Sequence, residues 1–205
     1  MNVLRLTDWK TPATTYPNVA VGCARLGFTR YGKGVYDCYG VGGYKYFECL
    51  RPIKVKTLKI RRKVTMVDDA PHFLAMREHA SCYQGHVVVA GLGLGLIVHA
   101  LQDNPRVDRI TVVEIEQDVI DLVGPLLKPD RLEIVRGDFR DFDGAADGIF
   151  YDLFVGNGHE LCHDAWMVFL RLCSQFQQAG TIRIHGFDND ALKTARMRLF
   201  NVEPH

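Results

Sequence analysis

Short apolar runs alternate with longer segments of helical periodicity from residue 86 onwards. Continuous apolar runs of this kind are typical of strands that are buried on both faces of a sheet. We expect such strands at residues 86–91, 109–115, 131–135, 150–155 and 181–186. Helices are expected at residues 70–83, 94–101, 117–127, 164–178 and 190–199. This alternation predicts an α/β fold with a doubly wound, mostly parallel sheet.

The N-terminal residues follow a different pattern, in which aromatic and β-branched runs are separated by glycines. Two such runs within residues 31–50 flank Gly42-Gly43 and predict a hairpin. In residues 53–64, lysines alternate with apolar residues until the apolar phase shifts by one residue at Leu58, as a β-bulge would produce. We therefore expect a small antiparallel β-sheet with one basic, solvated face.

Charge divides the chain near the same place as the hydrophobic pattern. The net charge of +1 combines 13 Lys/Arg against 3 Asp/Glu in residues 1–63 with 12 against 21 in residues 64–205. The sequence thus predicts two domains, a basic β-rich region (1–64) and an α/β domain (65–205). A hydrophobic fraction of 47% excludes a disordered chain. The lack of a long apolar run predicts no membrane association, and the polar N-terminus favours a cytoplasmic location.

The clearest chemical signal is the glycine loop at the end of the first buried strand. Gly91, Gly93 and Gly95 lie where that strand turns into a helix, and glycines there let backbone N–H groups approach a ligand closely. Glu114 ends the next strand, where a carboxylate can accept both hydroxyls of an adenosine ribose. The alternatives are a tight turn that binds no ligand and a carboxylate that is solvated at a strand end. The ordered combination favours a nucleotide site.

The spacing of the loop distinguishes between nucleotide-binding families. Leu96 stands where the dinucleotide pattern G-x-G-x-x-G needs its last glycine, and the observed G-x-G-x-G resembles motif I of class I S-adenosylmethionine (SAM)-dependent methyltransferases. VVEIEQDVI (112–120), RLEIVRGDFRDF (131–142) and FYDLFVG (150–156) resemble the family's next motifs in order. The resemblance implies a Rossmann-like fold that binds SAM.

The same resemblance assigns roles to residues after the second and third strands. It places Glu114 on the ribose, Ile115 against the adenine and Asp138 at the adenine amino group. Asp138 alternatively caps a turn. Phe139 either lines the adenine pocket or belongs to the core.

Within that superfamily the chain is most similar to spermidine synthase-like proteins. They also place a small β-sheet before the nucleotide fold, and their second motif is similar to VVEIE. This resemblance implies aminopropyl transfer from decarboxylated SAM as an alternative activity. However, Gly156 stands where those enzymes carry their catalytic aspartate, and their acidic polyamine-binding segment is absent. Since a polyamine nitrogen needs a carboxylate to take its proton, we expect methyl transfer to a small-molecule acceptor instead.

The segment after the fourth strand reads HELCH (159–163) and matches the H-E-x-x-H zinc motif. It directly follows a strand and a Gly-Asn-Gly loop, and no third ligand is evident, so we expect no metal. Chemistry in open α/β sheets takes place beyond the carboxyl ends of the strands. His159 and Glu160 are therefore the candidates for a general base or for substrate contacts, and the alternative is that both are solvated surface residues.

The basic segment Arg51–Lys63 offers a partner surface of a different kind. Its cations can neutralise phosphates, and Tyr44, Tyr46 and Phe47 lie nearby in sequence for base stacking, which makes a non-catalytic nucleic-acid or protein-binding module the second hypothesis. A solvated sheet face, or one complementary to the acidic domain, is the interpretation we favour. Only residues 187–205 follow the last expected strand, so the fold is expected to have a shortened C-terminus compared with the family. A sheet edge covered by a second copy, in a homo-oligomer, would fit that shortening.

Overall fold

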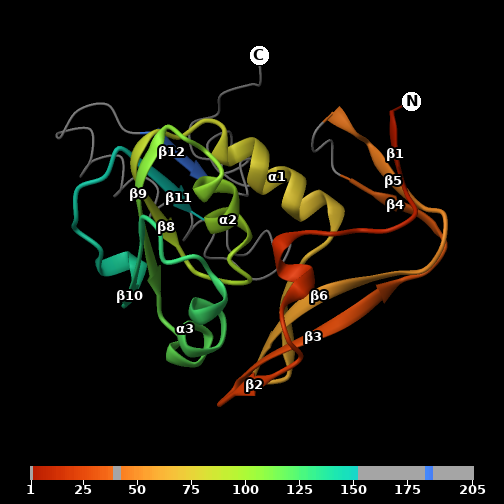
Figure 1. Cartoon of the computed structure of the whole chain (residues 1–205), viewed down its shortest axis with the longest axis horizontal. Helices are drawn as coiled ribbons and strands as arrows, with labels where there is room; N and C mark the ends of the chain where they lie inside the picture. The colour runs from red at the N-terminus through yellow and green to blue at the C-terminus, as the bar shows by residue number, and fades with distance from the viewer. Residues whose placement is uncertain (1, 39–42, 152–182, 187–205) are drawn as a thin grey trace, which may run out of the picture.

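The computed structural model describes residues 2–38 and 43–151, together with the backbone of the strand at 183–186. The helices expected at 164–178 and 190–199 and the shortened C-terminus lie outside these residues. In the described part, the fold is α/β and has an N-terminal group of strands beside a parallel sheet (Figure 1). No helix in this part of the chain is long and apolar enough to cross a membrane.

The parallel sheet has the predicted doubly wound order. Its strands are β8 (Gly85–Ala90), β9 (Val107–Glu114), β10 (Leu132–Arg136), β11 (Gly148–Tyr151) and β12 (Arg183–Gly186). They lie in the order β10-β9-β8-β11-β12, and each neighbouring pair is parallel. The chain winds outwards from β8 to β10 and then returns to β11 on the other side of β8. The topological switch point, where open α/β sheets bind ligands, is therefore between β8 and β11.

Strand β8 is buried on both faces, which explains its unbroken apolar run. Val87 and Val89 belong to the larger core cluster, whereas Val88 and Ala90 belong to a second cluster with Phe139. The larger cluster also contains buried residues of the helices α1 (Ala70–Ala80), α2 (Leu96–Gln102) and α3 (Gln117–Val123). The predicted helices at 70–83, 94–101 and 117–127 are confirmed, and their observed bounds differ from the expected ones by a few residues.

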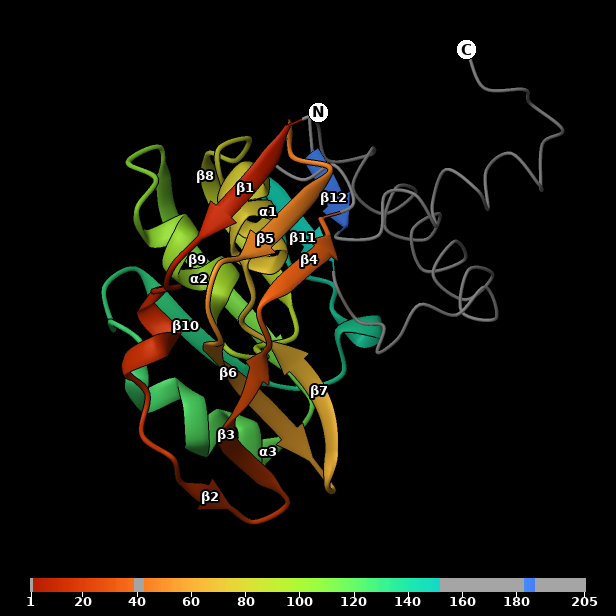
Figure 2. The same cartoon turned by 90° about the vertical axis from the view of Figure 1, so that its right-hand side faces the viewer.

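The N-terminal strands form two small sheets (Figure 2). β1 (Val3–Leu6), β5 (Tyr46–Cys49) and β4 (Gly34–Asp37) make one sheet, in which β4 and β5 are the antiparallel hairpin predicted around Gly42-Gly43. The other sheet is antiparallel throughout and has the order β2-β3-β6-β7. Its strands are β2 (Ala20–Val21), β3 (Ala24–Tyr31), β6 (Ile53–Ile60) and β7 (Lys63–Val67).

Strands β6 and β7 are joined by a turn that the sequence analysis did not identify. Arg61 and Arg62 both have positive φ, of 48° and 68°, as the two central residues of a type I′ turn require. Arginine is uncommon in this conformation, so the sequence carries no turn signal here. The predicted bulge is confirmed, because the β6–β7 register shifts between Leu58 and Lys59.

The prediction of a solvated basic face is wrong at Lys56, which is 1% exposed. Its Nζ donates to the backbone carbonyl of Tyr16 at 2.5 Å and to the side-chain oxygen of Asn18 at 3.2 Å. The same ammonium lies 3.9 Å from the centre of the Phe28 ring. Burial lowers the pKa of Lys56, and the nearby Asp68 carboxylate opposes that shift. A buried charge is tolerated only with such partners, and together they replace the water that Lys56 loses.

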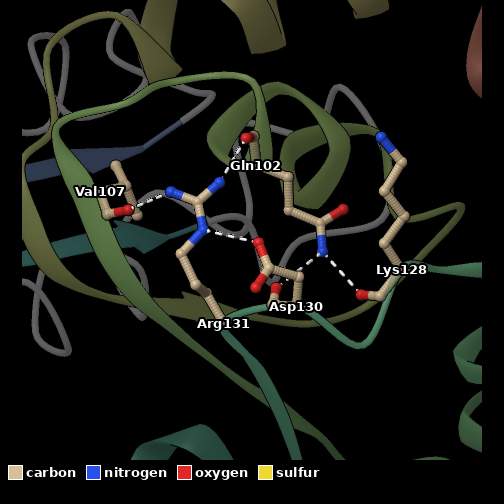
Figure 3. Close-up of polar contacts among 5 residues, drawn as sticks. All are labelled: Gln102, Val107, Lys128, Asp130 and Arg131. Carbon is tan, nitrogen blue, oxygen red and sulfur yellow. Dashed lines mark hydrogen bonds and ion pairs between the residues drawn. The ribbon is translucent and has the colours of Figure 1, made fainter.

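The loop before β10 is fixed to the end of α2 by hydrogen bonds (Figure 3). The Gln102 side-chain amide donates to the carbonyls of Lys128 at 2.7 Å and Asp130 at 3.3 Å. In return, the Arg131 guanidinium donates to the carbonyl of Gln102 at 2.6 Å and to that of Val107. These contacts hold edge strand β10 in place against β9, so the residues that follow β10 have a fixed starting point.

The antiparallel N-terminal sheet packs directly against the α/β part. Leu26 and Leu58 belong to the same core cluster as the helices, and Arg61 makes a 2.9 Å ion pair with Glu116, just before α3. The backbone N–H of Cys23 also donates to the Asp118 carboxylate at 2.7 Å. Core residues from both sides of residue 64 thus pack together, and the domain boundary at that residue stays a prediction.

Asp68 gives a testable consequence of this packing. Its carboxylate is fully buried and accepts a hydrogen bond from Thr11 Oγ1, and burial raises its pKa from 3.8 to about 6. Since folding raises this pKa, the contribution to stability is complete below about pH 4 and is lost as the pH rises through 6. We expect the unfolding free energy of the wild type to fall by about 3 kcal/mol relative to Asp68→Asn over this range. Urea denaturation at a series of pH values measures the difference.

The Thr11→Val variant serves as the matched control. The Thr11 hydrogen bond lowers the pKa of Asp68, so its loss should move the fall in stability to higher pH. A difference between the wild type and Asp68→Asn that does not change with pH would contradict the assignment.

Candidate functional site

The register of the parallel sheet brings the predicted site residues to one edge. Glu114 pairs with Arg136, and Ala90 pairs with both Val113 and Tyr151. The backbone N–H of Gly91 donates to the Val113 carbonyl at 2.9 Å. The residues that follow β8, β9 and β10 therefore start side by side at the carboxyl edge, beside the switch point.

The glycine loop adopts a backbone that only glycine takes without strain. Gly91, Gly93 and Gly95 have φ of 88°, 53° and 71°, all in the region that L side chains rarely occupy. The backbone N–H of Gly95 donates to the Leu92 carbonyl at 2.8 Å, which closes a tight turn just before α2. The three glycines singled out in the sequence are therefore required by the conformation of this loop.

Glu114 connects the loop to β9. It is 8% exposed; its Oε2 accepts from the backbone N–H of Leu92 at 2.7 Å, and its Oε1 accepts from that of Glu116 at 2.9 Å. The alternative of a solvated strand end is therefore wrong. Each carboxylate oxygen can accept a further hydrogen bond, because each has two lone pairs. Glu114 can hold the loop and bind two hydroxyl groups at the same time.

Met66, at the end of β7, contacts the same loop. Its Sδ accepts from the backbone N–H of Leu94 at 3.1 Å and lies 2.7 Å from where a Cβ on Gly93 would stand. A Cβ on Gly95 would lie 2.7 Å from a methyl carbon of Leu127. The sequence analysis missed Met66, since nothing in its neighbourhood along the chain marks it as a loop contact. A thioether is a weak acceptor, so a stronger one can take over the Leu94 N–H.

The three other cofactor-binding candidates in the described part have different surroundings. Ile115 is 56% exposed, a large apolar surface beside the loop. Asp138 precedes the 3-10 helix η4 (Phe139–Asp141) and accepts from the backbone N–H of Arg140 at 2.9 Å, so it caps a turn as one interpretation held. Its carboxylate also pairs with the Arg140 guanidinium. Phe139 is 2% exposed and stacks on Phe142, which makes it a core residue.

The catalytic candidates His159 and Glu160, and the whole HELCH segment, lie outside the described residues. Within residues 2–38 and 43–151, no group of three His, Cys, Asp or Glu side chains is arranged to hold a metal ion. Of two cavities in the described part, neither is lined by the glycine loop itself, although Leu127, which lies beside Gly95, lines the second. One, of about 360 Å³, lies between the 3-10 helix η1 (Pro12–Thr15) and the end of α2, and the other, of about 430 Å³, lies beside β10.

Comparison with known proteins gives only distant structural similarities. No family model and no curated protein sequence matches the chain. It is similar to a complex between the Haloferax volcanii Trm112 methyltransferase activator and a methyltransferase, at 19% identity over 46% of this chain and 47% of that chain, with a TM-score of 0.35. It is also similar to the 23S rRNA methyltransferase ErmE, at 21% identity over 63% of this chain and 49% of that chain, with a TM-score of 0.44. The chain thus spans about half the length of these structures.

The close approach at Gly93 can be tested by substitution. We expect Gly93→Ala to lower the unfolding free energy by about 1–3 kcal/mol, because alanine is strained at this φ and its Cβ meets Met66. Adding Met66→Ala should recover part of the loss, which a double-mutant cycle by urea denaturation measures. Gly27→Ala is the matched control, since a Cβ there has ordinary room beside Thr57. Equal losses at Gly93 and Gly27 would contradict the close approach.

Proposed function

We propose that the chain is a SAM-dependent transferase, and specifically a methyltransferase that acts on a small-molecule acceptor. One observation carries the proposal: a buried carboxylate, Glu114, is hydrogen-bonded to a loop of three positive-φ glycines at the switch point of a doubly wound sheet. The order of the sequence motifs supports SAM rather than a dinucleotide, since Leu96 stands where the dinucleotide pattern has glycine.

The described residues fit the adenosine part of such a ligand. The unused lone pairs of Glu114 accept the two ribose hydroxyls, and the exposed side chain of Ile115 packs on the adenine. The Leu94 N–H exchanges the Met66 thioether for a carboxylate oxygen of the cofactor. Asp138 accepts from the adenine amino group, and it must share its carboxylate with Arg140 to do so.

The bound cofactor would supply a methyl group on a positively charged sulfur, and the protein would supply position. Methyl transfer depends mainly on holding the acceptor in line with that group, so it needs few catalytic side chains. His159 and Glu160 stay our candidates for orienting the acceptor or taking its proton, since they follow β11 in sequence. We also propose that this methyltransferase is built on a spermidine synthase-like scaffold. Its aminopropyl chemistry from decarboxylated SAM is not favoured, because Gly156 replaces the aspartate that this chemistry needs.

Isothermal titration calorimetry with SAM and S-adenosylhomocysteine tests the cofactor. We expect both to bind the wild type, and Glu114→Gln to weaken binding by about 10- to 100-fold, because the substitution removes the charge from the ribose acceptor while it keeps the size of the side chain. Glu133→Gln is the matched control. Glu133 is a half-exposed carboxylate on β10 that pairs with Arg109, and its loss should leave the affinity unchanged. Absence of binding to the wild type would refute the proposal, and so would equal binding by Glu114→Gln.

A further inference from the structure

The β3–β6 pair of the N-terminal sheet places like charges directly opposite each other. Arg30 pairs in register with Lys54, and Arg25 pairs with Lys59. Among the residues that the structure describes, no acidic side chain pairs with any of these four cations. Like charges directly across a sheet destabilise it. The pairing therefore leaves a repulsion that a bound anion would relieve.

An exposed aromatic ring lies in the row next to Arg30 and Lys54. Phe28 is two residues from Arg30 on β3, so both point to the same face of the sheet, and Phe28 is 43% exposed. The buried ammonium of Lys56 holds the ring from one side. Phe28 is thus a supported ring whose remaining surface faces solvent.

Of the aromatic residues proposed for base stacking, Tyr44 and Phe47 do not offer such a surface, whereas Tyr46 is partly exposed and has the Lys45 ammonium 5.5 Å from its ring centre. Phe47 is 3% exposed and stacks on Tyr36, and Tyr44 packs against the same small core cluster. Lys56, from the predicted basic face, is buried as well. The sequence analysis overlooked Phe28. The register of β3 against β6 pairs Phe28 with Lys56 and places its ring in the row next to the exposed cations Arg30 and Lys54.

The combination of a ring and two adjacent cations distinguishes between anionic partners. The carboxylates of an acidic peptide would neutralise the cations but would offer no flat surface that stacks on Phe28. A single-stranded nucleic acid supplies both a flat base for the ring and a phosphate for the cations, and base–aromatic stacking of this kind does not depend on sequence. Charge and shape together therefore favour the nucleic acid.

We propose that Phe28, Arg30 and Lys54 form a binding surface for single-stranded nucleic acid, with a base stacked on Phe28 and a phosphate between the two cations. The neighbouring row of the same sheet face is Leu26, Leu58 and Met66, and Met66 contacts the glycine loop. The spacing of strands and residues puts Phe28 about 12 Å from Met66. Binding of nucleic acid to this surface is independent of the proposed function and of its small-molecule acceptor.

Fluorescence anisotropy with a labelled 12-nucleotide oligouridine and the full chain tests the surface. We expect binding at 50 mM salt that weakens as salt is added. Phe28→Ala should weaken it about 5- to 100-fold at an unchanged salt slope. The double variant Arg30→Gln/Lys54→Gln should reduce the slope of log K against log salt by about 0.7, since the one phosphate held between the two cations is no longer neutralised. Lys10→Gln/Lys128→Gln removes the same charge from exposed positions elsewhere and should leave the slope nearly unchanged.

Phe28→Trp separates loss of stacking from loss of folding. Tryptophan keeps a flat ring, so this variant should bind at least as well as the wild type, and its added emission should be quenched by the oligonucleotide. No binding to the wild type at 50 mM salt, or equal binding by wild type and Phe28→Ala, would overturn the proposal. Competition by polyglutamate as effective as that by unlabelled oligouridine would favour an acidic protein partner and would overturn it too. Calorimetry with SAM on the same variants reports on the cofactor site independently.

Discussion

The structure depends most on the carboxylate of Glu114. This buried group accepts one backbone N–H from the glycine loop and one from the residue before α3, so it joins the segment that follows β8 to the segment that follows β9. A buried charge is costly unless it is hydrogen-bonded, and the loop is costly to order because its glycines lose much conformational freedom. The hydrogen bond between Glu114 and the loop satisfies the buried charge and also helps to order the loop. The conformation of the loop and the position of the carboxylate that we propose as the ribose acceptor are therefore fixed together.

The antiparallel N-terminal sheet also contacts the glycine loop, through Met66. Its row of Leu26, Leu58 and Met66 packs against the core and ends on the glycine loop, and the next rows carry Phe28 and the opposed cations. Eight of the 13 Lys/Arg in residues 1–63 lie on this sheet or in its β6–β7 turn. The apolar end of its face holds the α/β part, while the polar end of the same face is open to solvent.

Sequence patterns were sufficient where a residue's role follows from its immediate neighbours. The apolar run of β8 required burial on both faces, and the glycine spacing indicated the tight strand-to-helix turn that the loop adopts. They were insufficient where the role depends on a distant partner. The burial of Lys56 needs the carbonyl of Tyr16 and the ring of Phe28, and the contact of Met66 with Leu94 joins residues from separate elements.

The central claim is that the glycine loop and Glu114 together form an adenosyl site. A crystal structure of the chain with S-adenosylhomocysteine tests it most directly. The account predicts both ribose hydroxyls within hydrogen-bond distance of the Glu114 carboxylate, with the Leu94 N–H released from Met66 and turned to the ligand. A ligand bound in the cavity between η1 and α2, or anywhere that leaves Glu114 without a contact to it, would contradict the account.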